Sequence, residues 1–317
     1  MILLWGLSGD DPLTAVTASL HRRNARYVLV DQRDILDTTV ELTAGPELGG
    51  TVTVRGEPVS LDDVGAVYLR QYDSRKLPDV AEAGAGVAAR VAAVETALWS
   101  WTEHTGARVF NRPSAMASNA SKPYQAGIIQ AVGFATPPTL ITTDPAAARA
   151  FWQRHGTLIY KSVSSVRSIV SRLAPDDTDR LADVVTCPTQ FQKYIPGHDV
   201  RVHMVGRDVF PCLVTSGADD YRYASRQGSS AEMSACTLPD DVLARCRALS
   251  ARLRLPLAGI DLRVTPDAEW YCLEINPSPS FTFYQRKTFQ PISETFTQLL
   301  IDSDRDRGAD RAGDAHQ

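Results

Sequence analysis

Two stretches of alternating apolar and polar residues in the C-terminal third constrain the fold of this chain more than any other feature. Gly259–Val264 and Trp270–Asn276 flank the turn residues Thr265–Ala268, and this pattern predicts an antiparallel hairpin. Because side chains alternate between the two faces of a strand, one face of the hairpin is apolar and must cover a core. The expected core-facing residues are Ile260, Leu262, Val264, Leu273 and Ile275.

The opposite face of this hairpin carries oxygen donors. Asp261 lies on the first strand, and Glu274 and Asn276 lie on the second. Each residue taken alone fits a solvated strand face, but acids on such apolar strands must be solvated, paired or bound to a metal. Carboxylate and amide oxygens on rigid strands suit Mg²⁺, with Mn²⁺ as a substitute. The sequence therefore predicts a Mg²⁺ site at Asp261, Glu274 and Asn276.

The length and the pattern of the first hundred residues predict several lobes. A chain of 317 residues exceeds the usual size of a single core, so two or three lobes around a cleft are expected. Short apolar runs alternate with helical patterns at the start, which predicts an α/β lobe with a parallel sheet. The expected elements are the strands Ile2–Trp5, Tyr27–Val30 and Ala66–Leu69 and the helices Pro12–Arg23 and Val87–His104.

A boundary is expected near Asn111–Ser114, where proline interrupts the pattern. The predicted division is an N-terminal α/β domain at 1–115, a central lobe at 116–189 and a C-terminal lobe with the metal hairpin at 190–301. Residues 302–317 mix charged residues with Gly and Ala and lack large apolar groups, so they are expected to be disordered.

Charge and composition argue against several classes of partner. A formal net charge of −4 gives no broad basic face for nucleic acid, and no apolar run reaches the length of a membrane span. The N-terminal residues lack the features of a signal peptide, so a cytoplasmic protein is expected. The five cysteines are scattered and unpaired in sequence, so neither a disulfide framework nor a zinc site is indicated.

The hairpin residues Gly259-Ile260-Asp261 and Glu274-Ile275-Asn276-Pro277 resemble the motifs of the ATP-grasp superfamily. Other segments follow in the family's order, so the resemblance covers roughly 111–300 and, more loosely, the N-terminal lobe. The chain looks closest to the branch of ribosomal-protein glutamate ligases and graspetide synthetases, which modify ribosomal peptides. This resemblance implies an ATP-grasp fold of α/β and α+β lobes, preceded by a pre-ATP-grasp α/β domain.

The resemblance also implies a site for ATP. Lys122 and Lys161 occupy the places of the family's phosphate-binding lysines, although 162–168 are serine-rich where many relatives have a glycine-rich loop. The segment Thr189–Val202 resembles the adenine hinge, which implies contacts from backbone groups of Lys193 and Ile195 to the base and from Asp199 to the ribose. The implied ATP-binding residues are Lys122, Lys161, Gln192, Lys193, Tyr194, Ile195 and Asp199.

Three arginines are candidates for the catalytic step. The segment Ser216–Tyr223 matches one that brings an arginine to the transferred phosphate, which implies this role for Arg222 in preference to Arg263; an ion pair with a neighbouring aspartate is the alternative. Arg201 shares a strand face with Asp199 and is the third candidate. For His203, on the same face, a packed or solvent-facing side chain is expected.

The implied reaction is the joining of a carboxylate to an amine after ATP converts the carboxylate to an acyl phosphate with release of ADP; formation of an ester in place of the amide stays open. The substrates would be small-molecule or peptide carboxylates and amines, and a homodimer is compatible with the sequence. The expected substrate-pocket residues are Arg70, Ser278, Tyr284 and Arg286. Three alternatives stay open: a kinase-like phosphotransferase on the same scaffold, a non-catalytic nucleotide-binding regulator, and a peptide-binding module.

Overall fold

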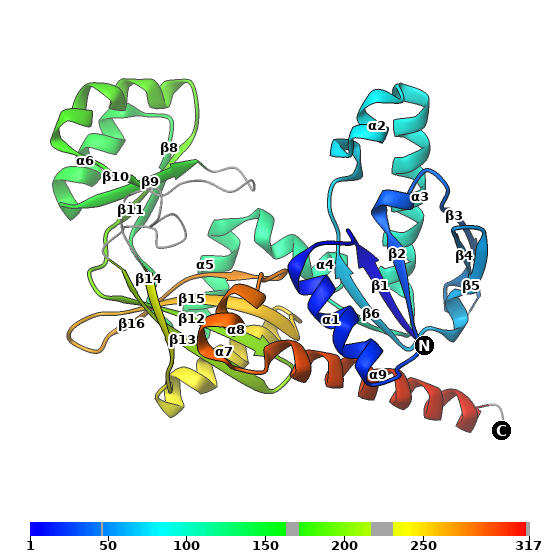
Figure 1. Cartoon of the computed structure of the whole chain (residues 1–317). Helices are drawn as coiled ribbons and strands as arrows, with labels where there is room; N and C mark the ends of the chain where they lie inside the picture. The colour runs from blue at the N-terminus through cyan, green and yellow to red at the C-terminus, as the bar shows by residue number, and fades with distance from the viewer. Residues whose placement is uncertain (46, 163–170, 217–230, 315–317) are drawn as a thin grey trace.

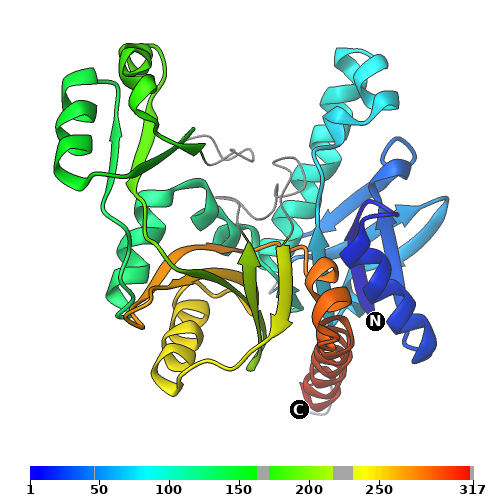
Figure 2. The ribbon, with the colours of Figure 1, turned by 60° about the vertical axis from the view of Figure 1, so that its left-hand side comes forward.

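The computed structural model describes residues 1–45, 47–162, 171–216 and 231–314. Within these residues four β-sheets are arranged in three lobes (Figure 1). The view in Figure 2 shows the central-lobe sheet as a separate body above the C-terminal sheet, with the N-terminal lobe beside them.

The N-terminal lobe has a parallel sheet in the order β2-β1-β6-β7, as the alternating pattern predicts. Its strands are β1 (Ile2–Gly6), β2 (Tyr27–Asp31), β6 (Ala66–Arg70) and β7 (Arg108–Phe110). A small antiparallel sheet adds β3 (Thr39–Thr43), β4 (Gly49–Val54) and β5 (Glu57–Ser60), and the helices are α1 (Asp11–Arg22), α2 (Pro78–Glu82), α3 (Ala85–His104) and α4 (Pro113–Met116). Helix α1 begins after Asp10, whose carboxylate accepts from the Leu13 N–H.

The central lobe has an antiparallel sheet in the order β10-β9-β11-β8. Its elements are β8 (Thr139–Thr142), α6 (Pro145–His155), β9 (Leu158–Ser162), β10 (Ser171–Arg172), a 3₁₀ segment (Pro175–Val185) and β11 (Thr189–Lys193), after the preceding α5 (Lys122–Ala131). This lobe has a core of its own, which includes Ala148, Leu158 and Phe191. The division of the chain at 115/116 and 189/190 stays a prediction.

The C-terminal lobe has a five-stranded antiparallel sheet in the order β14-β13-β12-β15-β16. Its elements are β12 (His198–Val205), β13 (Asp208–Ser216), β14 (Ala231–Ala235), α7 (Asp240–Arg252), β15 (Leu257–Val264), β16 (Trp270–Asn276) and α8 (Thr282–Thr288). Helix α7 and one face of the sheet enclose a core that includes Val202, Cys246 and Ile260. The hairpin predicted from the alternating residues is β15 and β16.

A β-bulge in this hairpin changes which residue of β16 faces the core. The pairing of β15 with β16 shifts between Asp261 and Leu262, so that Leu262 lies opposite Cys272 and Asp261 opposite Glu274. Leu273 is the extra residue on β16, and Cys272, fully buried, joins the core. The prediction that Leu273 faces the core was wrong, because strict alternation does not anticipate an inserted residue.

The long helix α9 spans Ile292–Asp314. The prediction that residues from 302 onwards are disordered was therefore wrong as far as Asp314. Charged residues of α9 have partners far away in sequence: Asp304 pairs with the Met1 amino group at 2.5 Å, and Arg307 pairs with Glu47. The helix runs beneath the N-terminal lobe (Figure 1). No helix in the described ranges is long and apolar enough to cross a bilayer.

The first turns of α9 help to form a core that the N- and C-terminal lobes share. Phe296 lies edge-on against Tyr68 and Phe110 of the N-terminal lobe and near Phe281 of the C-terminal lobe. The same cluster contains Ile2 from β1 and residues at the ends of β12 and β15. The two lobes therefore bury apolar surface in common. Trp5 and Tyr68 are also buried.

Candidate active site

Three adjacent strands bring the predicted metal ligands together. In the register of β12, β15 and β16, Arg201 lies opposite Asp261, and Asp261 lies opposite Glu274. Asn276 lies two residues further along β16, opposite Gly259, where a Cβ would collide with the Arg201 guanidinium. The face predicted from sequence alternation is therefore present on this sheet.

Cations neutralise both carboxylates of this face. The Arg201 Nη1 atom lies 2.6 Å from Asp261 Oδ1, and the Lys122 Nζ atom lies 2.8 Å from Glu274 Oε2. Lys122 also donates to Asn119 Oδ1 at 3.3 Å. The described residues contain no group of three or more His, Cys, Asp or Glu side chains arranged for a metal. Two carboxylates and one amide are a donor set that fits Mg²⁺, which keeps several water or phosphate ligands.

Buried amides hold the end of β16 in place. Asn111 Nδ2 donates to the carbonyls of Leu257 and Pro277, each at 2.6 Å, and Gln125 Nε2 donates to the Ile275 carbonyl at 2.8 Å. Sequence reasoning missed these positioning roles. The one local signal was the position of Asn111 at the predicted domain boundary. Its contact with Pro277, 166 residues away, cannot be recognised from the neighbouring sequence.

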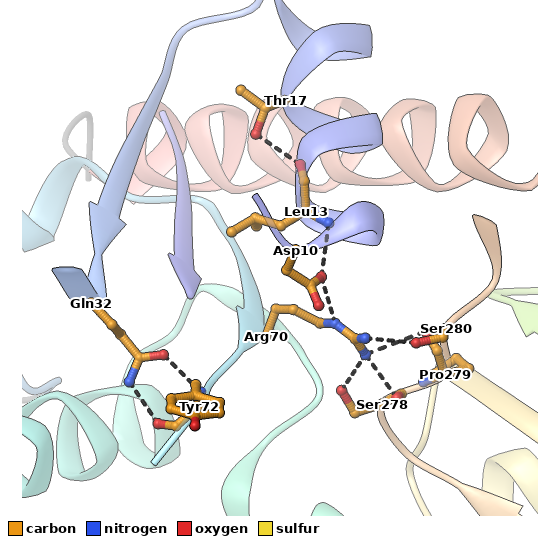
Figure 3. A network of polar contacts seen from close by, with 9 residues as sticks. All are labelled: Asp10, Leu13, Thr17, Gln32, Arg70, Tyr72, Ser278, Pro279 and Ser280. Carbon is orange, nitrogen blue, oxygen red and sulfur yellow. Dashed lines mark hydrogen bonds and ion pairs between the residues drawn. The ribbon is translucent and has the colours of Figure 1, made fainter. Parts of the chain in front are cut away.

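Arg70 connects the N-terminal lobe to the segment that follows Asn276 (Figure 3). Its Nε donates to Asp10 Oδ2 at 2.9 Å, and its Nη1 donates to both the hydroxyl and the carbonyl of Ser278 at 2.8 Å. Its Nη2 donates to Ser280 Oγ at 3.0 Å. The structure thus brings together two predicted substrate residues, Arg70 and Ser278. Asp10, which sequence reasoning missed, is recognisable as a helix cap in the short turn between β1 and α1.

The Ser278 backbone also reaches the predicted metal site. Asn276 Oδ1 accepts a hydrogen bond of 2.8 Å from the Ser278 N–H. Arg70, Ser278 and Asn276 therefore form a continuous chain of polar contacts from the N-terminal lobe to the oxygen-donor face. A group held by Arg70 would be coupled to the orientation of Asn276 through backbone atoms.

The segment predicted as the adenine hinge is held by its own polar contacts. The Lys193 N–H donates to the Pro138 carbonyl at 2.9 Å, and the Ile195 carbonyl accepts from Arg263 Nη1 at 3.1 Å. An adenine edge would therefore have to use other backbone groups here, or displace these contacts. The Arg172 guanidinium, which sequence reasoning also missed, lies 4.2 Å from the ring centre of Tyr194.

Asp199 and Arg263 form a bidentate ion pair. Arg263 Nε lies 2.9 Å from Asp199 Oδ1, and Arg263 Nη2 lies 2.9 Å from Asp199 Oδ2. The two residues were predicted to act separately, Asp199 on the ribose and Arg263 as a catalytic candidate ranked after Arg222. In the structure they bind each other, and Arg263 also contacts the Ile195 carbonyl. This arrangement favours a joint role in holding the hinge segment in position.

The other predicted residues are dispersed. Lys161 lies on β9 opposite Gln190, and Gln192 Nε2 donates to Thr139 Oγ1 at 2.9 Å, both in the central-lobe sheet. Arg286 is exposed and pairs with Asp11 of α1 at 2.8 Å. Arg222 and the serine-rich loop from 163 onwards lie outside the described residues. The roles of all these residues stay predictions.

His203 and Tyr284 pack together next to Arg201. Their ring centroids are 4.8 Å apart, and the Arg201 guanidinium lies 5.8 Å from the Tyr284 ring centre. His203 is fully buried, and neither ring nitrogen has a hydrogen-bond partner among the described residues. Burial, aided by the positive charge of Arg201, holds the pKa of His203 well below its ordinary value. The imidazole is therefore neutral in the folded protein.

We expect His203 to make the free energy of unfolding depend on pH below about 6.5. There the unfolded chain binds a proton that the folded chain excludes, so stability falls as pH falls, by up to about 1.4 kcal/mol per pH unit. Replacing His203 with Phe should remove this part of the slope in urea titrations between neutral and acidic pH. His198→Asn, at an exposed histidine, is the control and should keep the slope; equal slopes in all three proteins would contradict the assignment.

Comparisons with known proteins identify the fold. No family model matches the chain. The ATP-grasp ligase PsnB, solved with a phosphomimetic minimal precursor, Mg and ADP, shares 25% identity; the match covers 96% of this chain and 98% of that one with a TM-score of 0.81. A RiPP-associated ATP-grasp ligase from Chryseobacterium gregarium, solved with ADP and a leader and core peptide, shows the same fold at 23% identity, with 95% and 96% coverage and a TM-score of 0.82.

The chain is also similar in sequence to a ligase of amino acids. The D-alanine–D-alanine ligase of Synechococcus sp. (strain JA-3-3Ab) is 28% identical over 187 residues, which are 54% of this chain and 58% of that ligase. The chain thus matches little more than half the length of this relative. The predicted fold class and the predicted resemblance are confirmed by the near-complete structural matches. The chain therefore has the ATP-grasp fold, and the proteins that it resembles are ATP-grasp ligases.

Proposed function

We propose that this chain is an ATP-dependent carboxylate–amine ligase whose substrate carboxylate belongs to a peptide. The observation that carries the proposal is the cross-strand pair Asp261 and Glu274 with Asn276 beside it, each carboxylate already paired with a cation. The likeness to PsnB, solved with a precursor, Mg and ADP, supports ATP and Mg²⁺ as reactants and a peptide as substrate. Homodimer formation, the absence of nucleic-acid and membrane partners and a cytoplasmic location stay predictions from the sequence.

Different residues of the chain would have different roles in the reaction. Asp261, Glu274 and Asn276 would hold Mg²⁺, which supplies positive charge against the phosphates of ATP. Lys122 and Arg201, 2.8 and 2.6 Å from these carboxylates, could turn their charged groups to phosphate oxygens. A substrate carboxylate oxygen would attack the γ-phosphorus as ADP leaves. The amine would then attack the acyl carbon, lose a proton and expel inorganic phosphate.

Thermal unfolding with Mg·ATP tests nucleotide binding and the predicted role of Lys161. Because a ligand that binds only the folded state stabilises it by mass action, Mg·ATP at a hundredfold excess over its Kd should add about 2.7 kcal/mol. Lys161→Ala should lose most of the resulting shift in melting temperature. Lys76→Ala, at an exposed lysine on the N-terminal lobe, is the matched control and should keep it.

The product distinguishes a ligase from the alternatives. A ligase should release ADP only with an acceptor, and mass spectrometry should show a product lighter by one water than its precursors. A stable product that gains a phosphate group would indicate a phosphotransferase. Nucleotide binding without ADP release would indicate a regulator, and either result would overturn the proposed reaction.

A further inference from the structure

A large cavity lies where the N- and C-terminal lobes meet, apart from the candidate active site. It measures about 1470 Å³. Its walls are Gly65 and 106–109 of the N-terminal lobe, the turn between β12 and β13, the connection from α7 to β15, and 295–307 of α9. None of the predicted site residues lines it.

The topology places this cavity at the opposite end of the sheets from the candidate site. The N-terminal sheet is parallel, and Arg70 lies at its carboxyl edge. Gly65 and Ala107 stand immediately before β6 and β7, at the amino edge. In the C-terminal sheet, the lining residue Val205 ends β12, four residues beyond Arg201. A ligand in this cavity would therefore leave the reacting centre open.

The cavity concentrates positive charge in a protein whose net charge is −4. Its arginines are Arg108, Arg112, Arg207, Arg247, Arg254 and Arg307, of which Arg307 is paired with Glu47, against the aspartates Asp208, Asp302 and Asp306. The Arg112 guanidinium donates to the carbonyls of Thr102, Glu103, Thr105 and Ala107. Burial lowers the pKa of Arg112; the nearby Glu103 carboxylate opposes this shift, and repulsion from Arg108 and Arg254 adds to it. Arg108, Arg112 and Arg254 are thus close enough for Arg112 to be repelled by the other two, and a bound carboxylate would relieve that repulsion.

The size and the mixed lining favour an extended ligand over a small anion. Small-molecule pockets measure about 300–1,000 Å³, and this cavity is larger. The three aspartates repel any anion, but they can accept hydrogen bonds from backbone N–H groups, which a peptide has and a polyphosphate lacks. Apolar side chains such as Val205, Leu255 and Leu299 complete the walls. Arginine, apolar and acceptor groups together suit a polypeptide with acidic side chains.

We propose that this cavity binds an acidic segment of the peptide substrate, at a distance from the carboxylate that reacts. The proposal rests on the proposed function and deepens it, because it gives the peptide a second point of attachment. Binding there requires neither ATP nor turnover. It can therefore be measured separately from ligase activity, and either idea can fail without the other.

Fluorescence anisotropy with a labelled Glu-Ala repeat peptide tests the proposal on the full chain without nucleotide. The double variant Arg247→Gln/Arg254→Gln removes two exposed cavity arginines, and Arg26→Gln/Arg90→Gln removes two exposed arginines elsewhere. The first variant should weaken binding about tenfold or more, while the second should bind as the parent does. Added salt should weaken binding, and a Gln-Ala peptide of the same length should not bind.

Four results would overturn the proposal. They are no binding of the Glu-Ala peptide, equal weakening in both double variants, equal binding of the Gln-Ala peptide, and stronger arginine-dependent binding of tripolyphosphate than of the peptide. The last result would assign the cavity to a phosphate ligand. Circular dichroism and melting of both variants establish that they are folded before binding is compared.

Discussion

Replacing Glu274 with Gln should reduce acceptor-dependent ADP release by about a hundredfold or more while the protein stays folded. The substitution keeps the shape of the side chain but removes the charge that lies opposite Asp261 and pairs with Lys122. The predicted Mg²⁺ site would lose a charged ligand, and the concentration of Mg²⁺ needed for half-maximal activity should rise. A coupled ADP assay across a Mg²⁺ titration measures both effects.

Glu269→Gln is the matched control for this experiment. Glu269 lies just before β16, and its carboxylate accepts from the exposed Tyr271 hydroxyl at 3.0 Å. The substitution removes the same charge five residues from Glu274 and should leave both activity and the Mg²⁺ dependence unchanged. Full activity in the Glu274→Gln protein would show that this face does not hold the metal.

Replacing Phe296 with Ala should lower the free energy of unfolding by about 3–5 kcal/mol. The ring is fully buried, and its centroid lies 4.8 Å from that of Tyr68 and 5.3 Å from that of Phe110. Its removal would leave a cavity in the core that two lobes share, so the loss combines transfer free energy, aromatic contacts and inter-lobe packing. Urea unfolding followed by tryptophan fluorescence measures the change.

Phe289→Ala provides the comparison, because this ring is 89% exposed at the end of α8. The change in the free energy of unfolding should be within about 0.5 kcal/mol. A loss in the Phe296→Ala protein no greater than in this control would contradict the shared core. Two separate urea transitions in the Phe296→Ala protein would indicate that the lobes have begun to unfold independently.

The sequence predicted those parts of the site that local periodicity controls. Alternation placed Asp261, Glu274 and Asn276 on one face, and the register of β15 and β16 confirms that arrangement. The parallel N-terminal sheet followed from the alternation of short apolar runs with helical patterns. Both predictions depend on the spacing of apolar residues, which a single sequence displays directly.

The remaining features depend on partners that are distant in sequence. The bulge at Leu273 and the ion pair of Asp199 with Arg263 arise from how strands meet, and no local pattern encodes them. The helix beyond residue 302 forms without an apolar stripe, because Asp304 and Arg307 find partners near the beginning of the chain. Composition alone therefore suggested disorder where tertiary ion pairs favour a helix.

The distribution of cores determines which part of the molecule can move. The N- and C-terminal lobes share one apolar cluster, so their separation would expose it to water. The central lobe packs on itself, and its two connections to the rest, 132–138 and 194–197, carry the positive-φ residues Gly133 and Gly197. Rotation about these connections would keep both apolar clusters buried and would break only polar contacts such as those of Gly133 and Ile195 with Arg245 and Arg263. Opening and closing would therefore be a motion of the central lobe, and the oxygen-donor face and the arginine-lined cavity would stay fixed to each other.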